Sequence, residues 1–366
     1  MKRFSVEAGH VRYPVLFEPD RNTLARIIDR AGQIVIVSNP TVFALHGPAF
    51  IDDFLPRRTP IIPIMIGDGE RYKNRRTVSE LHDHFFDIAL SRGDLVIPLG
   101  GGVVGDTAGF AAATFKRGVR LLQAPTTLLA MVDSSIGGKV GINHARGKNL
   151  IGAFYQPEAV VVRPIWLSTL GRREIVEGLA EIIKGGFLSG DRQLLSAAAF
   201  DIEHHIQLIG RLARLAYRAM HYKGGIVARD IGDHNRRMIL NFGHTFAHAI
   251  EKVEGYRRYR HGEAVMAGMA GAIYLSNLAG FLSERLMRRE LERLLPWINE
   301  LKPLKNAPGD YFRPMLVDKK SENGILRFIL LRGGAGRPAI IPVRSQPMIL
   351  EAIARMKAFI NRGRQE

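Results

Sequence analysis

The hydrophobic period of the chain changes near residue 165, and this change constrains the fold more than any other feature. Before it, short runs rich in β-branched residues alternate with helical segments; the runs occupy residues 34–37, 61–65, 94–99, 118–123 and 159–163. Strands that alternate with helices are typical of a parallel sheet with helices packed on it. The first part of the chain is therefore predicted to be an α/β domain.

The second part has long helical periods and almost no strand signal. Helices are predicted over residues 173–187, 202–227, 243–253, 263–279 and 284–301, and a late strand over residues 325–331. We therefore predict two domains, an α/β domain over residues 1–165 and a mainly α-helical domain over residues 166–366. Ligands of open parallel sheets bind at the carboxyl ends of the strands, and pockets are common between domains, so we expect the site between the two halves.

The composition limits the chemistry of any site. The 366 residues include no cysteine, which excludes disulfides and thiolate nucleophiles and leaves His, Asp and Glu as metal ligands. The net charge is +17, but the arginines are scattered and no nucleic-acid-binding module accompanies them. A nucleic-acid partner is one interpretation of this charge. We favour the other, a basic surface combined with an anionic small substrate, and predict no nucleic-acid partner.

One uncharged stretch, residues 264–283, is long enough to span a bilayer. It contains Ser276, Asn277, Ser283 and three glycines, so a buried helix explains it better than a membrane span. The chain starts without the apolar core of a secretion signal. We therefore expect no membrane segment and a cytoplasmic location, which the absence of disulfides also fits.

A glycine-rich motif, Gly-Gly-Gly-Val-Val-Gly-Asp at residues 100–106, directly follows a predicted strand and opens a predicted helix. Gly100, Gly102 and Gly105 have the dinucleotide-binding spacing, in which glycines admit a pyrophosphate to the free amides of the helix N-terminus. Close packing of a strand and a helix would also explain such a turn. The next strand lacks the terminal acidic residue that usually binds the ribose, so a nucleotide would be held differently here.

A second group of residues resembles a metal site. His244 and His248 are four residues apart and share one helical face, and His261 follows later. Glu181 precedes them, with Lys184 about one helical turn after it. Two histidines and one glutamate are a familiar ligand set for a catalytic zinc that keeps one position open. The alternative is that these are helix-surface residues in a protein with twelve histidines.

A third group suits an anion. Lys139 and Lys148 stand beside glycine turns in the segments at residues 133–143 and 147–152. Backbone amides and an ammonium group can bind a phosphate or carboxylate together. Two exposed loops with solubilising lysines are the alternative interpretation.

Together these motifs resemble the 3-dehydroquinate synthase family. The resemblance includes the glycine motif, Pro-Thr-Thr-Leu-Leu from residue 125, Asp-Ser-Ser-Ile-Gly-Gly-Lys from residue 133 and Gly-Lys-Asn-Leu-Ile-Gly-Ala-Phe-Tyr-Gln-Pro from residue 147. In the second half it includes Ala-Glu-Ile-Ile-Lys from residue 180, the segment 240–251 and His-Gly-Glu-Ala-Val from residue 261. Order and spacing agree from about residue 13 to about residue 331.

The resemblance implies a nucleotide-binding α/β domain, a helical metal- and substrate-binding domain and a homodimer. It implies zinc as the usual metal, with cobalt as an alternative, on Glu181, His244 and His261. It implies NAD contacts at Asn39, Glu70, Lys73, Gly101, Gly102, Val103, Asp106, Thr126, Thr127, Asp133, Ser134, Lys148, Thr169 and Glu174. Either Glu70 or Asp106 would supply the polar contact that the strand end lacks.

The resemblance also implies the substrate contacts. These are Lys139, Asn149, Lys184, Lys223, Arg237, Asn241, His248 and one of Lys319 and Lys320. Arg117 belongs with them. The helix after the glycine loop runs away from the carboxyl edge of the sheet, so we expect Arg117 at the opposite edge and reaching the active site of the other subunit.

The family's enzymes are carbon–oxygen lyases of the shikimate pathway that convert 3-deoxy-D-arabino-heptulosonate 7-phosphate into 3-dehydroquinate and phosphate, with NAD recycled. His248 is a candidate for proton transfer, and the departing phosphate is the alternative base. The chain departs from the family pattern at residues 230–235, at Phe242 and at Ala247, and residues 13–20 resemble related cyclases. These departures put the exact substrate, not the chemistry, in question.

Three alternatives follow. The first is a related cyclase that makes an amino analogue of dehydroquinate, or a valiolone- or inosose-type product; Lys223 and Arg237 disfavour the last two because they suit a carboxylated substrate. The second is a metal-dependent polyol dehydrogenase, which the cationic segments at residues 139–149 disfavour. The third is a nucleic-acid-binding or inactive protein, an interpretation that depends on the net charge alone.

Overall fold

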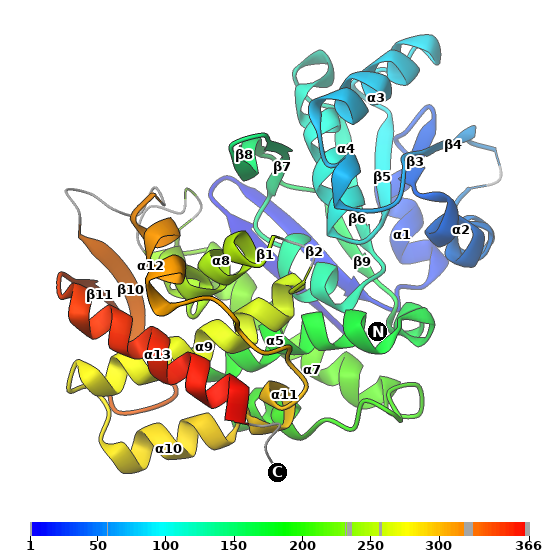
Figure 1. Cartoon of the computed structure of the whole chain (residues 1–366). Helices are drawn as coiled ribbons and strands as arrows, with labels where there is room; N and C mark the ends of the chain where they lie inside the picture. The colour runs from blue at the N-terminus through cyan, green and yellow to red at the C-terminus, as the bar shows by residue number, and fades with distance from the viewer. Residues whose placement is uncertain are drawn as a thin grey trace. The chain divides into compact units, whose positions relative to one another are not determined.

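The computed structural model describes residues 2–56, 58–230, 232, 236–255, 258–317 and 325–362, and the chain forms two compact units. Unit 1 is Met1–Ile175 with His204–Gly232, and unit 2 is Val176–Glu203 with Asp233–Glu366 (Figure 1). The predicted class, an α/β part and a mainly helical part, is confirmed. The units do not coincide with the domains predicted at residues 1–165 and 166–366, chiefly because a later helix belongs to unit 1; that domain division stays a prediction.

Unit 1 is built on a seven-stranded sheet in the order β1-β2-β9-β6-β5-β3-β4, parallel except for β1. The five predicted strands of this part are confirmed. The N-terminal antiparallel hairpin of β1 and β2 was not predicted. The bounds are β1 Lys2–Ala8, β2 Val11–Phe17, β3 Ile34–Ser38, β4 Ile61–Met65, β5 Leu95–Gly100, β6 Arg120–Pro125 and β9 Ala159–Val162.

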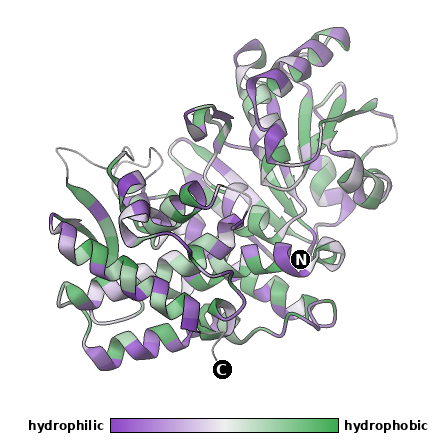
Figure 2. Ribbon diagram, in the orientation of Figure 1, coloured by the Kyte–Doolittle hydropathy of each residue, from purple (hydrophilic) through white to green (hydrophobic). Residues whose placement is uncertain are grey.

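Helices cover both faces of the sheet, so the inner strands are buried on both sides. Figure 2 shows hydrophobic residues concentrated on these strands. On one face, Val35, Val37 and Val96 pack against Leu81 of α3 and Ala108 of α4. The bounds are α1 Arg21–Ile28, α2 Pro40–Phe54, η1 Glu70–Tyr72, α3 Arg75–Asp87, α4 Gly102–Thr114, η2 Phe115–Arg117, η3 Ala130–Ser134, η4 Pro164–Thr169 and α7 Ile209–Val227.

Two features of unit 1 differ from the predictions. The segments predicted as possible exposed loops form an antiparallel hairpin of β7 Lys139–His144 and β8 Gly147–Phe154. The helix predicted from residue 202 begins at Ile209 as α7, and it packs on the N-terminal hairpin, where the Tyr217 ring lies 5.5 Å from Phe4 and 5.2 Å from Phe17. This contact explains why α7 belongs to unit 1.

Unit 2 is mainly helical. The helix predicted over residues 284–301 is broken, because Pro296 lacks the N–H that a continuing helix needs; α10 and α11 result. The predicted late strand is confirmed as β10, paired with β11 in a hairpin. The bounds are α5 Arg172–Ser189 (which starts in unit 1), α6 Arg192–Leu195, η5 Ser196–Ala199, η6 Arg236–Asn241, α8 His244–Val253, α9 His261–Leu278, α10 Glu284–Glu292, α11 Leu295–Ile298, α12 Pro308–Val317, β10 Leu326–Leu331, β11 Pro338–Val343 and α13 Gln346–Arg362.

The uncharged stretch after residue 264 forms most of α9, whose residues Ala264, Val265 and Met266 are fully buried against its neighbours. The interpretation of this stretch as a buried helix is confirmed. Within the part of the chain that the structure describes, no helix combines the length and the apolar character needed to cross a membrane.

Candidate active site

The glycine motif of unit 1 lies where the order of the strands reverses. From β3 the chain moves outward to β4 and then returns to β5 on the other side of β3. The carboxyl ends of β3 and β5 flank this switch point, where doubly wound sheets bind ligands. Asn39 follows β3 and Gly101 follows β5, and the Ser38 hydroxyl joins the two strand ends by donating to the Leu99 carbonyl at 2.7 Å.

Glycines let the backbone of this loop approach its neighbours closely. A Cβ atom on Gly101 would lie 3.2 Å from Thr127 Cγ2, and one on Gly102 would lie 3.3 Å from Ser134 Oγ. Gly101 is the N-cap of α4 and provides no side-chain cap, so the first amides of this helix, including that of Val103, point out of the helix toward any ligand. A helix N-terminus of this kind binds phosphate groups well.

Side chains predicted to contact NAD form one polar network around this loop. Lys73 Nζ donates to Asp106 Oδ2 at 2.5 Å. Burial raises the pKa of Asp106, and the Lys73 ammonium opposes that rise. Asn143 Nδ2 donates to Glu70 Oε1 at 2.7 Å, and the Asn149 amide donates to Asn143 Oδ1 at 2.9 Å. The hairpin of β7 and β8 is thereby tied to the segment at residues 70–73.

Asn143 was not among the predicted site residues, although it lies in the anion motif. It connects Glu70, a predicted cofactor contact, with Asn149, a predicted substrate contact whose φ of 55° is uncommon for a residue other than glycine. Such backbone strain is concentrated at functional sites. Lys139 begins β7, and Lys148 is the second residue of β8, the return strand of the same hairpin.

A second polar group joins α7 to the segment after β6. Lys223 Nζ, on the buried face of α7, donates to the carbonyl and to Oδ1 of Asp133, both at 2.5 Å. The Thr126 amide donates to the Gly100 carbonyl at 2.9 Å, and Thr127 Oγ1 accepts from the Ala130 amide at 3.1 Å. Two predicted residues, Lys223 and Asp133, are therefore direct partners of one another.

The end of α2 nearest the switch point carries Asn39 and, two helical turns later, His46. Asn39 caps the helix by accepting from the Val42 amide at 2.8 Å. His46 Nε2 lies 3.1 Å from Thr169 Oγ1, which itself donates to the Trp166 carbonyl at 2.9 Å. Because that hydroxyl proton is committed to Trp166, the hydroxyl accepts from His46. Sequence analysis missed His46; its spacing from Asn39 on one helix was the available signal.

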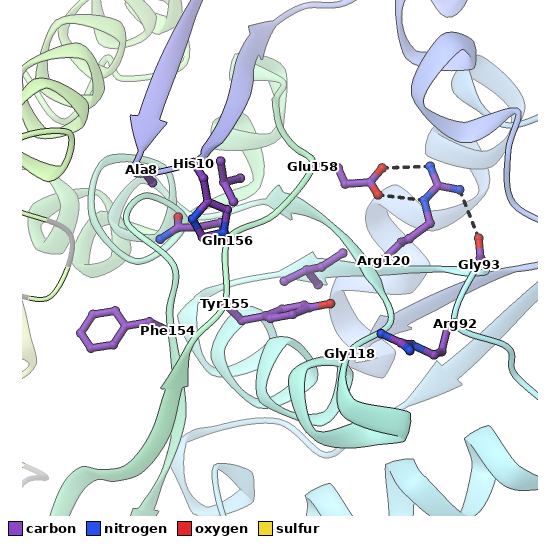
Figure 3. A pocket seen from close by; sticks show the side chains of 12 residues that line it. Ala8, His10, Arg92, Gly93, Gly118, Arg120, Phe154, Tyr155, Gln156 and Glu158 are labelled. Atoms are coloured by element: carbon purple, nitrogen blue, oxygen red, sulfur yellow. Dashed lines mark hydrogen bonds and ion pairs between the residues drawn. The ribbon is translucent and has the colours of Figure 1, made fainter.

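Arg117 lies apart from these residues, as its position in the topology predicted. It directly precedes Gly118 and β6, and β6 is parallel to β5, so it stands at the amino edge of the sheet. A pocket at this edge is lined by Gly118, Arg120 and Glu158 among others (Figure 3). Arg120 holds Glu158 by two contacts of 2.9 Å. Arg117 has a φ of 62° and its neighbour Lys116 a φ of 45°, so the chain is strained there.

In unit 2, three helices converge through close backbone contacts at glycines. A Cβ atom on Gly268 of α9 would lie 2.2 Å from the Gly243 carbonyl oxygen at the start of α8. A Cβ atom on Gly262 would lie 2.4 Å from Glu177 Cα on α5. Only glycine permits helices to approach this closely. The contacts bring the predicted metal ligands, one from each helix, to one place.

The three predicted ligands form a compact group. Glu181 Oε1 lies 3.7 Å from His244 Nε2 and 3.8 Å from His261 Nε2. All three ligand atoms lie within 4.8 Å of one another. Ligands about 2.1 Å from a tetrahedral zinc are themselves about 3.4 Å apart, so a small inward movement would complete the geometry.

The chemistry of these side chains fits a divalent cation. Glu181 Oε1 is buried and has no hydrogen-bond partner among the described residues, which is costly for a carboxylate unless a cation satisfies it. The other oxygen of Glu181 is held by Lys184, buried on the same helix. His244 Nδ1 lies 3.2 Å from the Phe242 carbonyl, so its Nδ1–H donates there and Nε2 presents a lone pair toward Glu181.

The remaining predicted residues of unit 2 lie near the start of α8. Arg237 is buried in η6 and Asn241 ends that helix. His248 is exposed on α8, and its ring centroid lies 5.6 Å from that of His244. Glu174, by contrast, lies in the first turn of α5 within unit 1. Lys319 and Lys320 lie outside the described residues.

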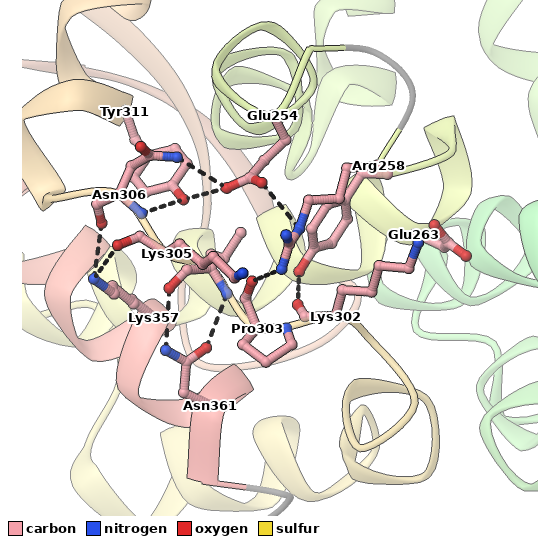
Figure 4. Close-up of polar contacts among 12 residues, drawn as sticks. Glu254, Arg258, Glu263, Lys302, Pro303, Lys305, Asn306, Tyr311, Lys357 and Asn361 are labelled. Atoms are coloured by element: carbon pink, nitrogen blue, oxygen red, sulfur yellow. Dashed lines mark hydrogen bonds and ion pairs between the residues drawn. The ribbon is translucent and has the colours of Figure 1, made fainter.

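The segment before His261 is fixed by a buried polar cluster (Figure 4). Glu254, at the end of α8, accepts from Tyr311 at 2.6 Å and pairs with Arg258 at 3.1 Å. Arg258 also donates to the Pro303 carbonyl at 2.7 Å. Burial, with the Glu254 charge, raises the pKa of Tyr311 and keeps its hydroxyl a donor. The cluster thus fixes the segment that precedes His261, one of the candidate metal ligands.

Comparison with known proteins supports the family resemblance that the sequence motifs indicate. A family model described as 3-dehydroquinate synthase N-terminal matches residues 63–177, and one described as 3-dehydroquinate synthase C-terminal matches residues 178–321. The 3-dehydroquinate synthase of Geotalea uraniireducens is 38% identical over 341 residues, which cover 90% of this chain and 92% of that protein. The 3-dehydroquinate synthase of Haemophilus ducreyi is 38% identical over 366 residues, with 97% and 99% covered.

Solved structures of related cyclases share the fold. A 2-deoxy-scyllo-inosose synthase complexed with carbaglucose-6-phosphate, NAD+ and Co2+ has a TM-score of 0.81 at 25% identity, covering 97% of this chain and 99% of that one. The 2-epi-5-epi-valiolone synthase of Streptomyces hygroscopicus, with NAD+ and Zn2+ bound, has a TM-score of 0.83 at 26% identity, covering 95% and 98%. With family models that match both halves and relatives that match most of its length, the chain belongs to the 3-dehydroquinate synthase family.

Proposed function

We propose that the chain converts 3-deoxy-D-arabino-heptulosonate 7-phosphate into 3-dehydroquinate and phosphate, with NAD recycled and a divalent cation bound. The observation that carries this proposal is the group of Glu181, His244 and His261, with its unpartnered carboxylate oxygen, in a chain 38% identical to curated 3-dehydroquinate synthases. Zinc is the proposed ion, and cobalt a working substitute, because structural relatives are described with Zn2+ or Co2+.

The proposed cofactor site is the carboxyl edge of the sheet in unit 1. Free amides at the start of α4 suit the pyrophosphate of NAD, and the pair of Lys73 and Asp106 suits a polar group beside it. When bound, NAD supplies a reversible oxidation of a substrate carbinol, and the cation supplies Lewis acidity at that oxygen.

The residues of the chain hold and orient the substrate. Lys139 and Asn149 offer an ammonium and an amide to an anionic group, and Arg237 offers a buried guanidinium to a carboxylate. Fixing a flexible sugar phosphate in one geometry lowers the entropic part of the barrier. His248, exposed one turn beyond His244, is placed to move a proton at a substrate hydroxyl.

The decisive assay uses purified protein, the heptulosonate phosphate, zinc and NAD in catalytic amount, with phosphate release and NADH absorbance followed together. We expect many phosphates released per NAD and no accumulation of NADH. Steady production of NADH from a polyol, without phosphate release, would instead identify a dehydrogenase.

A related cyclase is the second candidate, because the structural relatives with bound NAD+ are named for other products, 2-deoxy-scyllo-inosose and 2-epi-5-epi-valiolone. Arg237 distinguishes the candidates: removing one cation from a desolvated carboxylate contact typically costs ~2–5 kcal/mol. We expect Arg237→Leu to abolish most activity on the heptulosonate, whereas Arg236→Leu, its exposed neighbour, serves as control. Equal activity of the unaltered protein on sedoheptulose 7-phosphate would favour a valiolone-type cyclase.

We further propose a homodimer in which Arg117 serves the partner's active site, since it stands at the amino edge of its own sheet. Chains with Arg117→Ala and chains with His261→Ala should each be nearly inactive. In mixed dimers one site carries both changes and the other neither, so an equal mixture should recover about a quarter of the activity. Subunit exchange without any recovery would rule out a shared arginine.

A further inference from the structure

Glu251 is a buried carboxylate whose place in the fold the predicted site does not explain. It lies two helical turns after His244 on α8 and therefore shares its face. Its side chain is 3% exposed, and its Oε1 lies 3.6 Å from Nδ1 of His261. The other ring nitrogen of His261, Nε2, faces Glu181 at 3.8 Å. The His261 ring thus stands between two buried carboxylates.

The Nδ1 atoms of the two histidines face different kinds of oxygen. His244 Nδ1 faces a backbone carbonyl, that of Phe242, at 3.2 Å. His261 Nδ1 faces a charged carboxylate. A buried carboxylate costs several kcal/mol of desolvation unless its partners offset it, so a neutral acceptor would be the cheaper way to orient a ring. Glu251 differs from the Phe242 carbonyl in that a carboxylate can bring a negative charge to the ring that it faces.

We propose that Glu251 is a positioning residue of the metal site: it accepts the Nδ1–H of His261, directs the Nε2 lone pair toward the cation and strengthens that ligand through its charge. The proposal rests on the metal site of the proposed function. The 3.6 Å separation closes to a hydrogen bond by rotation of the Glu251 carboxylate about its terminal bond, a torsion with broad preferences. An anionic acceptor makes the imidazole a better donor to the metal.

The primary test measures zinc affinity by competition with a chelator and compares Glu251→Gln and Glu251→Leu with the unaltered protein. Gln keeps the shape and an acceptor oxygen but removes the charge, whereas Leu removes the acceptor as well. Losing such a partner typically lowers metal affinity by ~10–100-fold, so we expect about 10-fold for Gln and about 100-fold for Leu. The visible spectrum of the cobalt-loaded protein should also change, less for Glu251→Gln and more for Glu251→Leu.

Glu290→Gln is the matched control. Glu290 is a fully buried carboxylate of unit 2, held by Arg289 at 2.6 Å and Arg293 at 2.9 Å on α10. It tests for the general effect of removing a buried charge. We expect Glu290→Gln to lower the melting temperature without changing zinc affinity or the cobalt spectrum.

The possible outcomes distinguish a failure of the Glu251 proposal from a failure of the proposed metal-ligand set. If His261→Ala loses zinc but Glu251→Gln and Glu251→Leu bind it as tightly as the unaltered protein, Glu251 does not act on the His261 ligand and the proposal is wrong. If His261→Ala keeps zinc, the ligand set of the proposed function is wrong instead. Should the Glu251 variants fail to fold, spectra of the unaltered zinc-loaded protein with 15N-labelled histidine decide: His261 must carry its proton on Nδ1, shifted downfield, and an Nε2–H tautomer overturns the proposal.

Discussion

Unit 1 and unit 2 each contain a group of candidate site residues, and the two groups are built by different means. In unit 1 the loop after β5 offers backbone amides at a helix N-terminus, and the surrounding side chains are already paired, Lys73 with Asp106 and Lys223 with Asp133. In unit 2 three side chains from three helices converge, and one carboxylate oxygen, Glu181 Oε1, has no hydrogen-bond partner. The candidate site of unit 1 offers backbone groups, which every residue has, whereas that of unit 2 depends on specific side-chain atoms.

This difference predicts how well each unit tolerates single amino-acid substitutions. Backbone amides survive the loss of a side chain as long as the loop keeps its conformation, so single substitutions around the glycine loop should have graded effects. A three-ligand metal site fails when one ligand is removed or when its helices move apart. Unit 2 should therefore be the more sensitive to single substitutions.

The largest effect is expected from His261→Ala. The change removes one of three ligands, so zinc content should fall sharply and turnover by at least ~10²-fold, as when an electrostatic catalyst is lost. NAD binding, which we propose for unit 1, should stay unchanged when it is measured by titration calorimetry. Metal analysis of His248→Ala is the control, because His248 lies on the same helix as His244 but outside the ligand group. A His261→Ala protein with stoichiometric zinc and a near-normal rate would refute the ligand set.

Gly268→Ala should break the spacing of the helices without touching a ligand. The added Cβ would lie 2.2 Å from the Gly243 carbonyl oxygen, so α8 and α9 must separate. Overpacking of this kind typically costs ~1–3 kcal/mol of unfolding free energy, and zinc affinity should fall with it. Urea unfolding and chelator competition measure the two effects.

Gly309→Ala is the control for that substitution. Gly309 also lies in a helix of unit 2, α12, but a Cβ atom there would meet nothing within 4 Å. It should raise stability slightly, by up to ~1 kcal/mol, because alanine is the better helix former. If Gly268→Ala has the same free energy of unfolding and the same zinc affinity as Gly309→Ala, the contact between Gly268 and Gly243 does not set the ligand geometry.

The same contrast explains what the sequence could predict. Five strands of the sheet and the glycine loop after β5 are local patterns that were predicted, and the structure confirms them, whereas β1 and β2 were not predicted. The helices that carry Glu181, His244 and His261 were also predicted, yet their spacing alone left open whether the side chains meet. They meet because Gly243 and Gly268, which lie 25 residues apart in the sequence, bring two backbones into contact, and no local pattern shows such a pairing.

The hairpins were the harder part of the prediction. The strands β7 and β8 contain three glycines and several polar residues, so they lack the alternation that marks a half-buried strand. Their pairing is fixed from outside, by Asn143 and its bond to Glu70. His46 and Glu251 were missed for the same reason, since their importance lies in partners that are distant in the sequence.

The smallest effect is expected in unit 1, at His46. Burial lowers the pKa of His46, and the positive charge of Arg163 lowers it further. His46 is also packed against Trp166 and bonded to Thr169, so a neutral ring fits its surroundings. As the pH falls through about 6.5, the unfolded chain takes up this proton first, and the free energy of unfolding decreases until the lower folded pKa is passed. Above about pH 7 the residue should contribute no pH dependence.

His46→Gln keeps a donor for Thr169 but cannot titrate, so it should remove this part of the stability loss between pH 7 and pH 5. The melting temperature measured at both values should then fall less than in the unaltered protein, by a difference of under about 2 °C. His84→Gln, which removes an exposed imidazole from α3, controls for the loss of a histidine as such. We expect zinc affinity not to follow this change, because His46 lies in unit 1 and the candidate metal ligands lie in unit 2. An unchanged pH dependence in His46→Gln would mean that the ring is protonated equally in the folded and unfolded chain, and its bond to Thr169 would then carry no preference for the neutral form.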